Sequence, residues 1–166
     1  AVCFVYKDNH FQVIDEIEMY GSNTDEMCQE ILAKFPNAKV FAYPDPSAKA
    51  RKTSAGGRTD VSILQNNGFI VKMYNKHMQV RDRINSVNTA LMNGAGESSV
   101  SIHPSCKKLI QSLERQIYKP GTSQPEKDTG WDHMLDAFGY GVSFLKPVKR
   151  TLEEQQQPKT WGVKVA

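Results

Sequence analysis

The chain has 166 residues, of which 39% are hydrophobic and 23% are charged. These proportions exclude a wholly disordered chain, and the length is that of one compact domain. No apolar run approaches the roughly 18 residues of a membrane span, and we expect no signal peptide. The formal net charge of +3 suits a polyanionic partner, although many metabolic enzymes are equally basic.

The cysteine content indicates a reducing compartment. Cys3, Cys28 and Cys106 are widely spaced, odd in number and contain no CxxC pair. This pattern argues against a disulfide framework and against a cysteine-based zinc site.

The N-terminal part is predicted to form a hairpin, a helix and a strand. Residues 1–6 and 11–19 are rich in β-branched and aromatic residues and flank a polar turn, as in a hairpin. Apolar residues every four positions then predict a helix over 24–35. The apolar run 39–43, followed by Pro-Asp-Pro, is typical of a buried central strand.

The remaining chain alternates helices with short strands. Hydrophobic spacing predicts helices over 60–65, 79–93, 107–118 and 132–145, and strands over 69–71 and 100–102. Two polar segments, 47–59 and 119–130, are expected to be loops.

This order of elements predicts an α/β sandwich with a mixed central sheet flanked by helices. By topological analogy it is the order of an RNase H-like domain. We assign residues 1–146 to one domain and residues 147–166 to a polar C-terminal tail.

Several standard catalytic motifs are absent from the sequence. It contains no GxxxxGK[ST], GxGxxG, GxSxG or HExxH pattern, so nucleotide hydrolysis on this chain is not expected. The four histidines are scattered and indicate no zinc site.

The first candidate site residue is Asp45, which directly follows the apolar run 39–43. A carboxylate at the carboxyl end of a buried strand points into the crevice where α/β sheets bind ligands. The alternative is that Pro-Asp-Pro is a rigid turn in which Asp45 caps the next segment.

The second candidate is the start of the last predicted helix. Asp132 and Asp136 are four residues apart and therefore share a helical face, where two like charges repel unless a divalent cation lies between them. Alternatively, Asp132 simply interacts with the helix dipole and Asp136 is solvated. His133 is a third ligand, a supporting donor or polar surface.

Other charged residues receive simpler interpretations. Asp60 is predicted to cap a helix, and Asp82 with Arg81 and Arg83 is expected to form an ordinary charged helix face. Four basic residues follow Asp45 closely enough to propose that they contact phosphate: Lys49, Arg51, Lys52 and Arg58.

Six stretches in order resemble the nuclease domain of the large terminase subunit of tailed bacteriophages, the motor that packages and cuts the viral genome. The resemblance covers roughly residues 1–146, and its landmarks are residues 11–21, 43–46, 57–68, 83–87, 102–107 and 132–140. The last landmark looks like the family's DHxxDAxxY helix and is the most specific.

The resemblance implies an RNase H-like endonuclease that cleaves double-stranded DNA with little sequence preference. Its acidic cluster would hold two Mg²⁺ or Mn²⁺ ions. Asp45 would match the strand-end carboxylate, and Asp136 would be the next ligand, with Asp132 and His133 alongside.

The family resemblance also implies partners and a location. The partners would be the terminase ATPase domain, the small terminase subunit and the portal protein. The location would be the host cell cytoplasm, and no membrane would be a partner.

One family feature is missing from the sequence. The family's first carboxylate lies in a Gly-x-Asp stretch just before the part that matches residues 1–6. We therefore expect either a piece of a larger motor protein or a member that lacks this ligand and cuts weakly.

Three other functions remain open from the sequence. One is another RNase H-like nuclease, such as a junction resolvase or recombinase core. Another is a non-catalytic DNA-binding or motor-docking module that uses only the basic loop. The third is a small-molecule enzyme, which would have a closed apolar pocket instead of an open acidic cleft.

Overall fold

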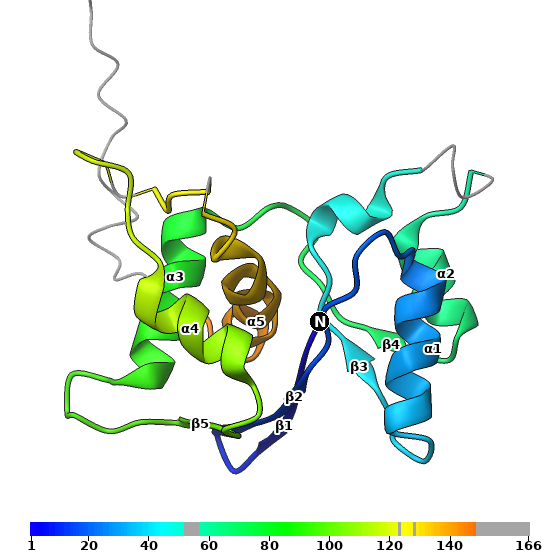
Figure 1. Ribbon diagram of the computed structural model, residues 1–166, viewed down its shortest axis with the longest axis horizontal. Helices are drawn as coiled ribbons and strands as arrows, with labels where there is room; N and C mark the ends of the chain where they lie inside the picture. Colours follow the sequence, from blue (N-terminus) through cyan, green and yellow to red (C-terminus); the bar gives the residue numbers. More distant parts are fainter. Residues whose placement is uncertain (52–56, 123, 128, 149–166) are drawn as a thin grey trace, which may run out of the picture.

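A hairpin of β1 (Val2–Lys7) and β2 (His10–Glu16) lies between two groups of helices (Figure 1). Its turn residues Asp8 and Asn9 both have positive φ, at 49° and 61°, as expected of a type I′ hairpin turn. This computed structural model describes residues 1–51, 57–122, 124–127 and 129–148, and the account below concerns them.

The first group contains α1 (Thr24–Lys34), the 3₁₀ helix η1 (Pro46–Lys49) and α2 (Asp60–Asn66), beside the short strands β3 (Phe41–Ala42) and β4 (Ile70–Val71). Asn23 caps α1 and Thr59 caps α2, each in a reciprocal capping box. The prediction that Asp60 caps α2 is therefore wrong by one residue. The predicted loop over 47–59 is also partly wrong, since η1 occupies its start and buries Ala48.

The second group contains α3 (Val80–Leu91), β5 (Val100–Ile102), α4 (Lys107–Arg115) and α5 (Asp132–Leu145). Helix α4 ends three residues earlier than its apolar spacing predicts. The N-terminus of α4 is capped from the hairpin, because the Glu16 carboxylate accepts hydrogen bonds from the backbone N–H groups of Lys108 and Leu109, at 2.8 Å each.

The strands form two sheets. β2 pairs antiparallel with β1 and parallel with β5, whereas β3 pairs in parallel only with β4. The predicted mixed α/β class, with a mixed sheet flanked by helices, is confirmed by β1, β2 and β5. The expectation that the run 39–43 contributes a central strand is wrong, since β3 and β4 form a separate sheet. Aromatic packing joins the sheets instead: Phe4 of β1 stacks on Tyr43, with ring centroids 6.0 Å apart.

The main core lies between the hairpin and helices α3, α4 and α5. Its buried members come from all of these elements, and they are Phe11, Val13, Val87, Ala90, Cys106, Leu109, Met134, Phe138 and Val142. The core therefore packs one face of α5 against β1 and β2. The adjacent face of α5 does not take part in this core. Among the described residues, no helix is both long and apolar enough to cross a membrane.

Candidate functional site

Three polar side chains follow one side of α5, one helical turn apart. Asp132, Asp136 and Tyr140 are spaced by four residues, which in an α-helix places them in a row. We call this row the α5 edge. It begins at the helix N-terminus, where the dipole favours negative charge.

The loop after β3 brings Asp45 to the far end of the α5 edge. The Tyr140 hydroxyl donates a hydrogen bond to Oδ2 of Asp45, while Oδ1 accepts one from the backbone N–H of Ser47 at 2.6 Å. The interpretation of Asp45 as a cap is confirmed, whereas the expected buried strand before it is wrong, since Phe41 of β3 is 44% exposed. The carboxylate caps η1, and it also faces the last helix.

The Asp45–Tyr140 contact affects the pKa of both side chains. Burial disfavours the charged form of Asp45, but hydrogen bonds from Ser47 and Tyr140 outweigh it, so the pKa of this carboxyl is lowered. Burial, together with the hydrogen bond to Asp45, raises the pKa of Tyr140 to about 12. At neutral pH the pair is a phenol donating to a carboxylate.

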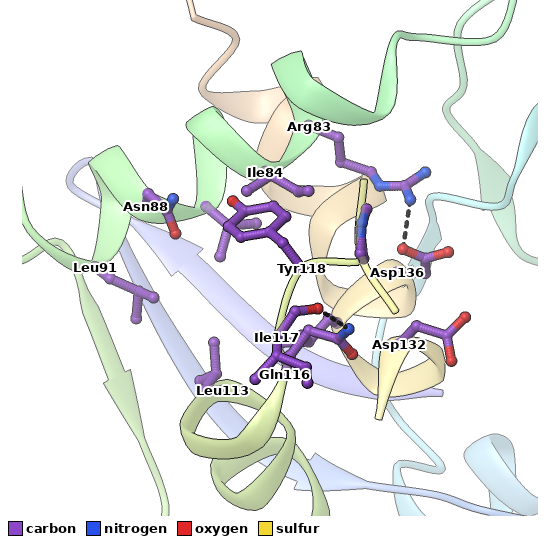
Figure 2. Close-up of a pocket in the computed structure, with 13 residues that line it drawn as sticks. Arg83, Ile84, Asn88, Leu91, Leu113, Gln116, Ile117, Tyr118, Asp132 and Asp136 are labelled. Atoms are coloured by element: carbon purple, nitrogen blue, oxygen red, sulfur yellow. Dashed lines mark hydrogen bonds and ion pairs between the residues drawn. The ribbon is translucent and has the colours of Figure 1, made fainter. Parts of the chain in front are cut away.

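A buried arginine from α3 occupies the middle of the α5 edge. Arg83 is only 6% exposed and donates to Oδ1 of Asp136 (Figure 2). Its guanidinium also stacks over the Tyr140 ring at 4.5 Å. A Cβ at Gly139 would lie 3.0 Å from Cγ of Arg83, so the glycine makes room for this stack. The expectation of an ordinary charged helix face is therefore wrong for Arg83.

The two carboxylates at the start of α5 differ in their contacts. Burial and the nearby Asp132 charge raise the pKa of Asp136 more than Arg83 lowers it. Asp132 is 6% exposed, and its Oδ1 is buried with no hydrogen-bond partner among the described residues. Asp132 lies in the first turn of α5, as the simpler sequence interpretation expects, but Asp136 is not merely solvated, since it pairs with Arg83.

The donor chemistry along the α5 edge fits a hard divalent cation, although the described residues contain no group of three acidic, histidine or cysteine side chains close enough to enclose one. Mg²⁺ is commonly held by one or two carboxylates together with substrate phosphates. Asp132 and Asp136 supply such a pair, and the unpartnered oxygen of Asp132 lacks the contact that a cation would provide.

The remaining predicted site residues that the structure describes lie at the surface. His133 is exposed, as are Lys49, Arg51 and Arg58. Lys49 Nζ donates to the Asn75 side chain at 3.1 Å, and Arg51 forms a β-bridge with Thr59. Lys52 falls outside the described residues.

Sequence reasoning missed Arg83, Tyr140 and His77 as site residues. His77 Nδ1 lies 3.9 Å from Oδ1 of Asp45. Two signals were available: Arg83 precedes the buried Val87 by four residues, and Tyr140 follows Asp136 by four. No comparable spacing points to His77.

A groove of about 250 Å³ borders the α5 edge, between α3, α4 and α5 (Figure 2). Its apolar lining includes Ile84, Leu113 and Leu135, and both Asp132 and Asp136 contribute to it. The groove is therefore neither a purely apolar pocket nor a purely acidic cleft.

Comparisons with known proteins give a structural likeness only. No family model matches the chain, and no curated protein sequence matches it. Two solved structures of the large terminase from a thermophilic bacteriophage superpose on it. One, in complex with ATP-gamma-S, has a TM-score of 0.62 and 18% identity over 86% of this chain; the other has a TM-score of 0.61 and 20% identity over 84%.

The chain spans about a third of those proteins, covering 35% of each. At such low identity the likeness concerns the fold: this chain shares the α/β architecture of one part of a phage large terminase.

Proposed function

We propose that this chain is the RNase H-like nuclease domain of a phage large terminase. In this role it cleaves double-stranded DNA during genome packaging, in the host cytoplasm. It would act together with an ATPase domain, a small terminase subunit and a portal protein. The fold likeness to the thermophilic phage's large terminase supports the packaging role, and the α5 edge supports the nuclease role.

The observation that carries the nuclease proposal is the state of Asp132. This carboxylate is 6% exposed, one of its oxygens has no hydrogen-bond partner within the part of the chain that the structure describes, and it lies one turn from a second carboxylate. Leaving a buried charge uncompensated costs several kcal/mol, of the order expected for buried ion pairs broken on one side. A bound cation at Asp132 and Asp136 would remove that cost.

The chain's own residues have distinct roles in this proposal. Asp132 and Asp136 bind the metal, and Asp45 contributes a further carboxylate from the far end of the α5 edge, held by Tyr140. Bound divalent ions would activate the attacking water and stabilise the leaving oxygen of the phosphodiester. Arg83 fixes the orientation of Asp136 through its guanidinium.

The exposed cations at the end of η1 and after it are assigned to the DNA backbone. Lys49 is the last residue of η1, Arg51 and Arg58 follow it in sequence, and Lys52 belongs to the same stretch of sequence. Phosphate contacts position a duplex without reading its bases, which accounts for cleavage with little sequence preference.

Plasmid cleavage in the presence of Mn²⁺ tests the assignment. We expect Asp136→Ala and Asp45→Ala each to reduce the rate at least about a hundredfold, a loss typical of removing one group that stabilises charge in the transition state. Asp132→Asn keeps the shape of the side chain, removes its charge and should weaken Mn²⁺ binding roughly 10–100-fold.

Asp15→Asn is the matched control. Asp15 is a carboxylate of β2 that pairs with Lys34 of α1 and not with a residue of the α5 edge, so this variant should cut at the parental rate. If Asp45→Ala and Asp136→Ala also cut at the parental rate, the catalytic assignment is wrong.

A non-catalytic DNA-binding or motor-docking module is the second candidate. It is favoured by Arg83, which already neutralises Asp136, and by the lack of a three-ligand cluster among the described residues. Such a module binds DNA equally well in EDTA and never nicks it, whereas the proposed nuclease requires the metal for cleavage.

A further inference from the structure

The groove between α3, α4 and α5 is large enough for a side chain. Its volume of about 250 Å³ is roughly eight times the ~30 Å³ that one water occupies in the liquid. In Figure 2 it runs from Leu91 at one end to Asp132 and Asp136 at the other. A single water or metal ion would leave most of it unfilled.

Two unpartnered acceptors belong to residues that line this groove. The Gln116 side-chain amide donates from Nε2 to the backbone carbonyls of Ile117, at 2.9 Å, and Glu126, at 2.7 Å, which holds the amide in one orientation. Its Oε1 is buried, as is Oδ1 of Asp132, and neither atom has a hydrogen-bond partner in the residues that the structure describes. Both atoms are acceptors, so the missing partner is a donor.

The charges favour a cationic donor. Within the lining, Arg83 and Asp136 neutralise each other through their ion pair. Asp132 then remains as the uncompensated charge of the lining, and it is 6% exposed. A neutral donor would satisfy the hydrogen bond but leave the buried charge uncompensated.

The walls favour an aliphatic stem. Leu113 and Leu135 line the groove, and Ile117 at its rim is 60% exposed. Lysine and arginine side chains combine such a stem with a cationic head, and they bury the stem along apolar surface.

We propose that this groove binds a basic side chain, lysine or arginine, presented by a protein partner. The cationic head donates to Asp132 and Gln116, and the methylene stem packs against Leu113 and Leu135. Charge complementarity at Asp132 selects this occupant over an apolar one, which would leave both acceptors without a partner.

Binding at the groove also affects the proposed nuclease, and this consequence rests on the proposed function. A cation paired with Asp132 competes with a metal ion for the same carboxylate. A partner that inserts a basic side chain would therefore inhibit DNA cleavage until the partner dissociates.

The test uses small cations in place of the partner. Methyl and amide NMR spectra of the whole chain are titrated in EDTA with n-butylammonium and n-butylguanidinium, which represent lysine and arginine, and with n-butanol as the neutral control. We expect either cation to shift the Leu113 and Leu135 methyl resonances, with a Kd on the order of millimolar for so small a ligand. Butanol should bind at least about tenfold more weakly.

Variants locate the binding. Asp132→Asn should weaken cation binding at least about tenfold. Glu114→Gln removes an exposed carboxylate from α4 outside the groove lining and should leave the affinity unchanged. Asn88→Trp adds bulk at an exposed lining position on α3 and should block binding even if Asp132→Asn does not fold.

Three results would overturn the proposal: neither cation shifts the methyl resonances, butanol binds as tightly as butylammonium, or Asn88→Trp binds like the parent. Because the titration contains no metal or DNA, its failure is distinct from a failure of the nuclease assignment. Binding in EDTA without any cleavage by the Mn²⁺-loaded chain would refute only the nuclease.

Discussion

At the scale of single residues, the contact between Asp45 and Tyr140 links the loop after β3 to the end of α5. The phenol is kept protonated by a pKa raised to about 12, and the carboxyl is kept ionised by a lowered pKa. Across the neutral range, therefore, neither partner titrates and the hydrogen bond persists.

Replacing Tyr140 by phenylalanine should destabilise the fold in a pH-dependent way. The folded-state pKa of Asp45 lies below its unfolded value, so its stabilising effect is present above about pH 4 and is lost as the pH falls through the folded-state pKa. We expect Tyr140→Phe to lower the free energy of unfolding by about 1 kcal/mol at pH 7, since Asp45 is 34% exposed, and by less in acid. Urea unfolding from pH 7 to 3 measures this.

Tyr74→Phe is the control for that series. Tyr74 donates to the backbone carbonyl of Ser143 at 3.0 Å, so its loss also removes one phenol hydrogen bond. The acceptor does not titrate, and the loss should be independent of pH. Equal pH profiles for the two variants would contradict the assigned state of Asp45.

The sequence predicted the acidic members of the site better than the basic one. A four-residue spacing is enough to place Asp132 and Asp136 on one helical face, and a strand end is enough to propose Asp45. Arg83 was misinterpreted because a charged residue between other charged residues usually faces solvent. Its burial depends on Gly139 and Tyr140 of another helix, and local sequence does not encode that contact.

At the scale of elements, α4 depends on a carboxylate from β2. Glu16 accepts from two backbone N–H groups in the first turn of α4, whereas the residue before that helix, Cys106, provides no side-chain cap. We expect Glu16→Ala to lower the free energy of unfolding by about 1–2 kcal/mol and to speed amide hydrogen exchange in the first turn of α4.

Glu18→Ala is a closely matched comparison. Glu18 pairs with the ammonium group of Lys108, so it contacts the side chain of the same residue whose backbone Glu16 caps. An exposed ion pair contributes less than about 1 kcal/mol, and α4 exchange should be unaffected. If the two variants behave alike, the contribution of Glu16 is not capping.

At the scale of the whole molecule, α5 packs closely against the hairpin at Gly141. A Cβ at Gly141 would lie 2.7 Å from the ring of Phe4 in β1, closer than packed carbon atoms tolerate. Phe4 also contacts the rings of Phe11, Tyr43 and Phe138, so a shift at this point disturbs both sheets.

Gly141→Ala should therefore destabilise the protein despite the better helix propensity of alanine. Overpacking lowers the free energy of unfolding by about 1–3 kcal/mol, whereas the better helix propensity of alanine raises it by at most about 1 kcal/mol. Thermal unfolding of Gly141→Ala, Phe4→Leu and the double variant measures the coupling, and the double variant should be more stable than the sum of the single effects predicts. Gly94→Ala, which meets no atom within 4 Å, should stay within about 0.5 kcal/mol of the parent.

The pairing of strands was the least predictable feature of the fold. Helices such as α3 and α5 follow from local apolar spacing, and the hairpin follows from its turn. β3 and β4 contain two residues each, too few to show which neighbour they choose. Partner choice among strands depends on contacts distant in sequence, and the single predicted sheet proved to be two.

The placement of β2 between β1 and β5 sets the order in which the chain can fold. The hairpin forms from adjacent residues, but the second partner of β2 begins at Val100, and the helix that Glu16 caps lies 92 residues from it in sequence. Closing so long a loop costs chain entropy before any contact repays it, and it slows folding. During synthesis, β2 therefore has one open edge until residues 100–102 have been made, and this strand is the segment most in need of protection from aggregation.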